Sequence, residues 1–208
     1  MEAHSSHCNV NRHKYQTTTP EYQDSQIPDV TRTCEELSCR LYTEKQQTVS
    51  HVVCGCSHIA PSQYKTQHNK MLRPVYHALL ERYGFDEYDY SSPWYVQSYP
   101  QPSKENNEAK ILWDIPWQLK KCPKNGANKP DISILDQKNK EWSLVEGTIR
   151  TPGTIAERTK YKQNKYVDLR LRINNLYPGY KVKLITTVFD YLAAYCKDLY
   201  KELNMLFG

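Results

Sequence analysis

Residues 129–149 read KPDISILDQKNKEWSLVEGTI, and this stretch decides the fold. It holds two runs rich in β-branched and large apolar residues, which are typical of strands, with a polar turn between Asp136 and Glu141. Each run carries one carboxylate, Asp131 in the first and Glu146 in the second. Two adjacent strands with one acid each can place both acids around one divalent metal ion, so this pair is the first candidate for a functional site.

The second run predicts a central strand that is covered on both faces. Side chains alternate along a strand, so one face carries Trp142, Leu144, Glu146 and Thr148. The opposite face, with Val145 and Ile149, is apolar too. A buried glutamate is costly unless a metal ion or a lysine compensates it. The alternative is that Glu146 lies at the strand end and meets solvent.

The helix expected next, about Thr154–Leu176, supplies a lysine. Its apolar stripe advances in steps of four and three residues: Ile155, Thr159, Lys162, Tyr166, Leu169, Ile173 and Leu176. Lys162 lies within the stripe that should face the sheet, where a lysine either extends outward to solvent or meets a buried acid. Lys165 flanks the same face. The alternative is a lysine-rich helix that is solvated throughout.

The rest of residues 108–208 predicts a small α/β or α+β domain, a mixed sheet flanked by helices. Lys110–Ile115 and Lys181–Val188 complete the strands, and a helix is expected at about Tyr191–Leu206. A right-handed crossover should join the third and fourth strands. Asp114, at the end of the first strand, is a candidate third acid.

Four segments precede this domain: a polar tail expected to be disordered at 1–32, a Cys/His segment at 33–60, a basic helical segment at 61–84 and a linker at 85–107. The helical segment, roughly Ser62–Tyr83, has a stripe of three-four spacing: Tyr64, His68, Leu72, Val75 and Leu79. Pro74 is expected to kink or interrupt this helix.

Of the seven cysteines, five lie between Cys8 and Cys56, which favours metal binding over disulfides in a chain without a secretory signal.

Composition sets outer limits. The chain has 208 residues, enough for one domain and an appendage, and its net charge of +5 permits a nucleic-acid partner. No apolar run follows Met1, so we expect no signal peptide. The longest apolar stretch, Leu184–Cys196, is interrupted by Asp190 and is shorter than the roughly 20 residues of a membrane helix. We therefore expect a soluble intracellular protein that is not secreted and has no membrane partner.

In the order of these motifs, the chain resembles the C-terminal region of a reverse transcriptase polyprotein from site-specific non-LTR retrotransposons. That region holds a cysteine–histidine zinc knuckle followed by a restriction-enzyme-like endonuclease domain. The resemblance covers about residues 34–208 and is carried by CRLY at 39–42, QTVSHVVCGC at 47–56, YKTQHNK at 64–70, ILWD at 111–114, KPD at 129–131 and KQNKY at 162–166. It implies a restriction-endonuclease-like core behind an irregular Cys/His segment.

The resemblance also implies roles for the candidate residues. Asp131 and Glu146 would bind Mg²⁺ or Mn²⁺, with Asp114 in support. Lys162 or Lys165 would be the catalytic lysine, and Tyr166 would belong to the same face. Members of the family usually carry Asp at the position of Glu146, so the carboxylate here reaches one methylene further.

For the knuckle, the resemblance implies a zinc ion. Tyr42 stands where the family pattern has a second cysteine, and tyrosine is a poor substitute for a thiolate. Cys34 could replace it, which gives the set Cys34, Cys39, His51 and Cys56; Cys54 is another candidate. The alternative is a cluster of buried free cysteines.

The expected function is a retrotransposon-derived protein that nicks one DNA strand, a phosphodiester hydrolase acting in the nucleus. Four residues are expected to contact DNA, or RNA of the parent element: Lys65, His68, Lys70 and Arg73. The chain holds no Tyr/Phe-x-Asp-Asp polymerase signature, so we expect a truncated or domesticated fragment. The alternative is an inactive remnant that only binds nucleic acid.

Overall fold

The computed structural model describes residues 38–59, 63–85, 89, 91–93, 95–120, 123, 126–151, 153–190, 194, 195 and 198–207, without the side chains of 42–44 and 205. The predicted tail at 1–32 and Cys34 lie outside these residues. None of the described helices has the length and apolar character that crossing a membrane requires.

The centre of the fold is a five-stranded mixed sheet, and this confirms the predicted α/β class. Its strands lie in the order β3 (Ser103–Glu105), β4 (Ala109–Trp113), β5 (Ile132–Asp136), β6 (Glu141–Arg150) and β7 (Lys181–Asp190). Neighbours from β3 to β6 are antiparallel, whereas β6 and β7 are parallel, as expected for a crossover connection. The segment predicted as a linker, 85–107, contains β3, a short polar edge strand with no apolar alternation to reveal it.

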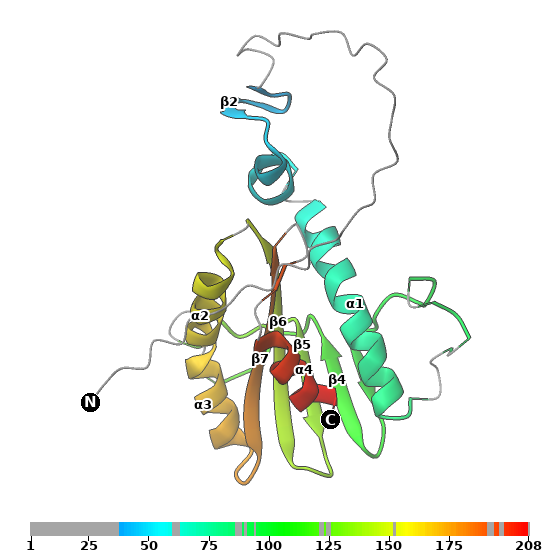
Figure 1. The fold of residues 1–208 in the computed structure, drawn as a ribbon. Coiled ribbons are helices and arrows are strands. Elements are labelled where there is room, and N and C mark those ends of the chain that lie inside the picture. The colour runs from blue at the N-terminus through cyan, green and yellow to red at the C-terminus, as the bar shows by residue number, and fades with distance from the viewer. Residues whose placement is uncertain are drawn as a thin grey trace.

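Helices cover both faces of the sheet (Figure 1). α1 (Lys65–Arg82) and α4 (Asp198–Phe207) pack on one face, where Leu72, Leu79 and Leu206 join a buried cluster with Val145. α2 (Ile155–Lys165) and α3 (Val167–Leu176) pack on the other, where Leu169 and Ile173 contact the cluster of Trp142 and Leu144. β6 is therefore buried on both faces from Trp142 to Thr148, as its sequence predicts.

Three helix predictions need correction. The single helix expected at 154–176 is two helices, because the chain breaks at Tyr166 (φ −101°, ψ 7°), and Leu176 at its end is 52% exposed rather than buried. The last helix begins at Asp198, not near Tyr191. Pro74 lies inside α1 and does not end it. The buried Leu72 and Tyr76 on either side hold α1 against the sheet, which offsets the cost of about 3 kcal/mol for an interior proline.

The Cys/His segment forms a small unit of its own beyond the end of β6. A hairpin of β1 (Ser38–Cys39) and β2 (Tyr42–Gln46) is followed by the short π-helical turn η2 (His51–Gly55). In Figure 1 this unit lies beyond the N-terminal end of α1. Ser50 Oγ and Thr151 Oγ1 are 3.3 Å apart, and this hydrogen bond joins the unit to the residue after β6.

Gly147 allows α1 to approach β6 closely. A Cβ at this position would lie 2.5 Å from Met71 Cε and 3.0 Å from Leu72 Cδ2. Met71 can move aside, but Leu72 is fully buried and cannot. We therefore expect Gly147→Ala to destabilise the fold by about 1–3 kcal/mol, the usual cost of overpacking, in urea unfolding. Gly153→Ala would not serve as a control because φ there is positive (87°), whereas Ser143→Ala on the same strand is a suitable one.

Glu202 on α4 gives the stability a pH dependence. Its Oε2 accepts hydrogen bonds from Thr186 N (2.8 Å) and Thr186 Oγ1 (3.3 Å). Burial raises the pKa of Glu202 and outweighs these bonds, which lower it. An acid whose pKa is higher in the folded than in the unfolded state stabilises the fold at low pH, and this contribution is lost as pH rises through the folded pKa. Glu202→Gln keeps an acceptor, so we expect its stability relative to the wild type to increase as pH rises above about 4.3, the usual pKa of a glutamate, measured by urea unfolding. A difference that does not change with pH would contradict this.

Candidate functional site

The carboxylate of Glu146 is the centre of a buried network of donors from α2 and the residue that follows it. Glu146 is 3% exposed, so its charge needs partners from the protein. Lys162 Nζ donates to Oε1, and Lys165 Nζ lies 3.3 Å from the same oxygen. Tyr166 Oη donates to Oε2 at 2.8 Å. The sequence alternatives of a Glu146 in solvent and a fully solvated Lys162 are therefore both wrong.

Tyr166 connects this network to the end of the neighbouring strand. It is fully buried, and its hydroxyl also lies 2.9 Å from Lys129 O and accepts from Lys165 Nζ at 2.9 Å. Burial raises the pKa of Tyr166 far above its usual range, and the charges of Glu146 and then Asp131 raise it further. Tyr166 thus stays protonated, and the charges of both carboxylates stabilise the protonated form of its buried hydroxyl.

Asp131 lies just before β5, at the level of Glu146, because Ile132 pairs with Val145 in the antiparallel register. Its Oδ2 accepts from the backbone N–H of Gly147 at 2.7 Å and lies 3.1 Å from His68 Nε2 on α1. Burial lowers the pKa of His68, but the hydrogen bond and the charge of Asp131 outweigh it and the pKa stands above its usual value. The pair therefore favours the ionic form, a protonated imidazole beside a carboxylate.

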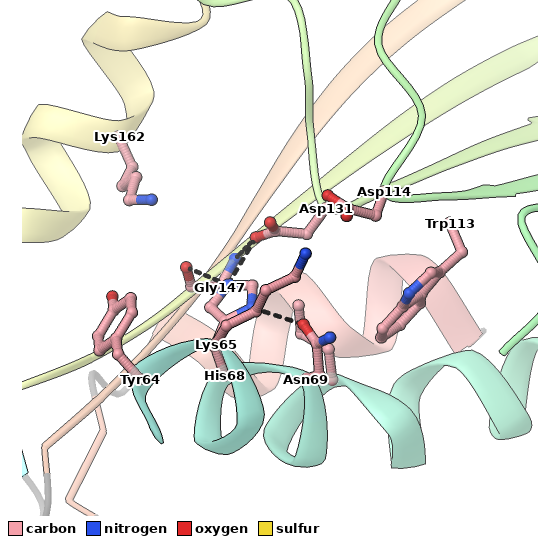
Figure 2. Close-up of a pocket in the computed structure, with 10 residues that line it drawn as sticks. Tyr64, Lys65, His68, Asn69, Trp113, Asp114, Asp131, Gly147 and Lys162 are labelled. Atoms are coloured by element: carbon pink, nitrogen blue, oxygen red, sulfur yellow. Dashed lines mark hydrogen bonds and ion pairs between the residues drawn. The ribbon is translucent and has the colours of Figure 1, made fainter. Parts of the chain in front are cut away.

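A pocket of about 250 Å³ opens between α1, the ends of β4 and β5, and α2. Figure 2 shows Asp131 and Asp114 on one wall, His68 and Lys65 from α1 on another, and Lys162 projecting from α2. Asp114 follows β4 with a positive φ of 53°, and its carboxylate forms an ion pair with Lys129 Nζ at 2.8 Å. The structure thus brings together Asp114, Asp131 and Lys162, with Glu146 directly behind the lysine.

Both acids of this site already have a cationic partner from the protein. Carboxylate oxygens are the ligands that Mg²⁺ and Mn²⁺ prefer. Glu146 is paired with Lys162 and Asp131 with His68, so an ion would have to replace these contacts. Within the described part of the chain, the acids Asp114, Asp131 and Glu146 do not form a compact set of three ligand atoms, and neither do Asp131, His68 and Glu146.

Such a set does form in the Cys/His segment, which could hold a metal ion. One ligand atom each from Cys39, His51 and Cys56 lies within 4.8 Å of the others. The two sulfurs are 4.0 Å apart, close to the roughly 3.8 Å edge of a zinc tetrahedron with bonds of about 2.3 Å. Burial raises the pKa of Cys56, but hydrogen bonds from the backbone of Ile59 and His58 outweigh it and lower the pKa, which favours the thiolate that binds metal.

The two other cysteine candidates stand apart from this set. Cys34 lies outside the described residues. Cys54 is not a member of the set, and burial raises the pKa of its thiol. Of the four ligands expected from the sequence, the structure therefore brings three together.

The residues expected to contact nucleic acid are divided between two environments. Lys65 and Lys70 are exposed on α1, and Lys65 lines the pocket. His68 is held by Asp131, while Arg73 donates to Gln97 O at 2.8 Å and lies over the ring of Tyr99. Two of the four are thus occupied by contacts within the protein.

Sequence reasoning missed the contact of His68 with Asp131 and that of Tyr64 Oη with Thr148 Oγ1 (3.0 Å). Tyr64, just before α1, and His68 within it are polar members of the predicted apolar stripe, as Lys162 is of the stripe on α2. That common feature is the signal that could have identified them.

Comparison with models of known protein families gives no match to this sequence, and comparison with curated proteins gives none either.

Proposed function

We propose that this chain is a metal-dependent nuclease that cuts one strand of DNA, derived from the endonuclease region of a non-LTR retrotransposon polyprotein. One observation carries the proposal: Lys162 on α2 lines one pocket with Asp131, and its ammonium reaches the buried Glu146 behind it, while α1 forms the opposite wall. The order of one helix, antiparallel strands, a helical connection and a parallel strand supports a restriction-endonuclease-like core. Such an enzyme would act on chromosomal DNA in the nucleus.

In this proposal Asp131 and Glu146 hold Mg²⁺ or Mn²⁺, with Asp114 beside them. The ion would supply an activated water and neutralise charge on the attacked phosphate. Lys162 lines the pocket, so its ammonium can pair with a phosphate oxygen as negative charge develops. His68 holds a proton at Nε2 at the pocket wall, from which it can pass to the departing oxygen. Tyr166 and Lys165 position the Glu146 carboxylate from behind.

The test is nicking of supercoiled plasmid by the full chain. We expect conversion to open circles with Mg²⁺ or Mn²⁺ and none with EDTA. DNA binding is measured in parallel by gel shift with EDTA, so that binding and cutting are separated. Binding without cutting in either metal would refute the nuclease.

The second candidate is a remnant that binds nucleic acid without cutting it. It is favoured by the ion pairs of Lys162 with Glu146 and of His68 with Asp131, which neutralise both acids without a metal. The remnant is also favoured by Glu146, which stands where members of the resembled family usually carry Asp. The plasmid assay distinguishes the two candidates directly.

We also propose that Cys39, His51 and Cys56 bind zinc, with Cys34 or a water as the fourth ligand. Purified protein is expected to contain about one zinc per chain by elemental analysis, because the spacing of the two sulfurs fits one tetrahedral ion. Cys56→Ser should lose that zinc. Cys54→Ser is the matched control, since Cys54 is two residues away and outside the set, and it should keep the zinc. Equal zinc content in both variants would contradict this assignment.

A further inference from the structure

A second pocket, of about 350 Å³, lies where the Cys/His segment meets the end of β6. Its polar lining comes from both parts: Lys45, Gln46, Thr48, Ser50, His51, Arg150 and Thr151. Among the described residues that line it there is no aspartate or glutamate. Two cationic side chains in a pocket without a carboxylate give it a positive potential.

Arg150 is a residue of this pocket with an unsatisfied hydrogen-bond donor. Its Nε is buried, yet it has no hydrogen-bond partner in the described part of the structure. The acid nearest in register is Asp190 on β7, which uses Oδ1 to accept from Ala194 N at 2.8 Å. A buried donor without a partner costs about 1–3 kcal/mol, and an anion in the pocket would remove that cost.

The other groups of the lining suit an oxyanion. Thr48 Oγ1 accepts from His51 N at 3.0 Å, which leaves its own hydroxyl proton to donate. Lys45 is exposed at the pocket and carries three donors. Together with the Arg150 guanidinium, these donors match the oxygens of a phosphate, which arginine binds in a bidentate way.

We propose that this pocket binds a backbone phosphate of the DNA strand, away from the position of cutting. Gly147 lines the first pocket and Arg150 the second, and both belong to β6. Three residues of extended strand span about 10 Å, so both pockets lie within reach of a single bound strand. The identity of the strand as substrate rests on the proposed function, whereas phosphate binding by Arg150 does not require cutting.

The experiment measures DNA binding with EDTA present, so that cutting plays no part. Fluorescence anisotropy with a labelled oligonucleotide is recorded over a range of salt for the wild type, Arg150→Gln and Arg172→Gln. Arg172 is the matched control because it is paired with Asp168 on α3 and lines neither pocket. We expect Arg150→Gln to weaken binding about tenfold and to reduce the salt slope by about one, and Arg172→Gln to change neither.

An NMR measurement and a second variant test the phosphate site further. The NMR signal of the Arg150 Nε–H group should shift with inorganic phosphate and, at lower concentration, with the oligonucleotide. A shift with inorganic phosphate alone would overturn the assignment to a DNA strand. If Arg150→Gln proves unfolded by circular dichroism, Lys45→Gln replaces it, because Lys45 is exposed. Wild-type affinity and salt slope in the folded variant would overturn the phosphate site, whether or not the chain nicks plasmid.

Discussion

Replacing Asp131 by Asn is expected to lower Mg²⁺-dependent nicking by about 10³-fold, which corresponds to about 4 kcal/mol of activation free energy. The amide keeps the size of the carboxylate and an oxygen that can accept from Gly147 N, so the local backbone should hold its shape. What is lost is the negative charge, and with it a ligand for the metal and the ionic partner of His68. The measurement is the initial rate of open-circle formation from supercoiled plasmid.

The matched control for Asp131→Asn is Glu141→Gln. Glu141 lies on β6 as Glu146 does, but it pairs with Lys183 at the opposite end of the strand. Its loss should leave the nicking rate within about twofold, because Glu141 lines neither pocket and its ion pair is remote from Glu146. DNA binding by Asp131→Asn should be kept or strengthened, since a negative charge leaves the pocket, and this shows that the variant is folded. Equal nicking by Asp131→Asn and the wild type would remove Asp131 from the active site.

Lys162→Met is expected to lower nicking by about 10²-fold, and Lys165→Met by much less than that. Both lysines contact Glu146 Oε1, but only Lys162 lines the pocket. Lys165 lies behind the carboxylate, where it donates to the hydroxyl of Tyr166. Methionine keeps the apolar stem of lysine, so each variant removes the charge while much of the packing is preserved.

The two lysine variants decide between the alternatives that the sequence leaves open. Lys160→Met is the control, because Lys160 is exposed on the same helix and should not affect nicking. Measuring kcat and KM separately gives a second test. Loss of a group that acts on the phosphate lowers kcat, whereas loss of a purely structural partner lowers the amount of folded protein. The reverse order, with Lys165→Met the more damaging, would assign the phosphate contact to Lys165.

Much of the fold could be predicted because burial imposes a period on the sequence. The alternation along Glu141–Arg150 identified β6 as a strand with two covered faces, and it placed Glu146 on the face toward α2 and α3. The step of three and four residues from Ile155 to Lys162 identified the lysine that meets this acid. β3 had no such period, since a polar strand at the sheet edge buries little, and it was missed.

The sequence by itself determined which faces of β6 and α2 are buried and that Glu146 and Lys162 lie on them, because those features depend on spacing within one element. Only the tertiary structure decided which groups meet across elements. His68 reaches Asp131 from 63 residues earlier in the chain. The break between α2 and α3 at Tyr166 also depends on the tertiary structure, because the buried hydroxyl of Tyr166 lies between Glu146 and Lys129 O. These contacts follow from the packing of α1 and α2 on opposite faces of one sheet, and local periodicity carries no information about that arrangement.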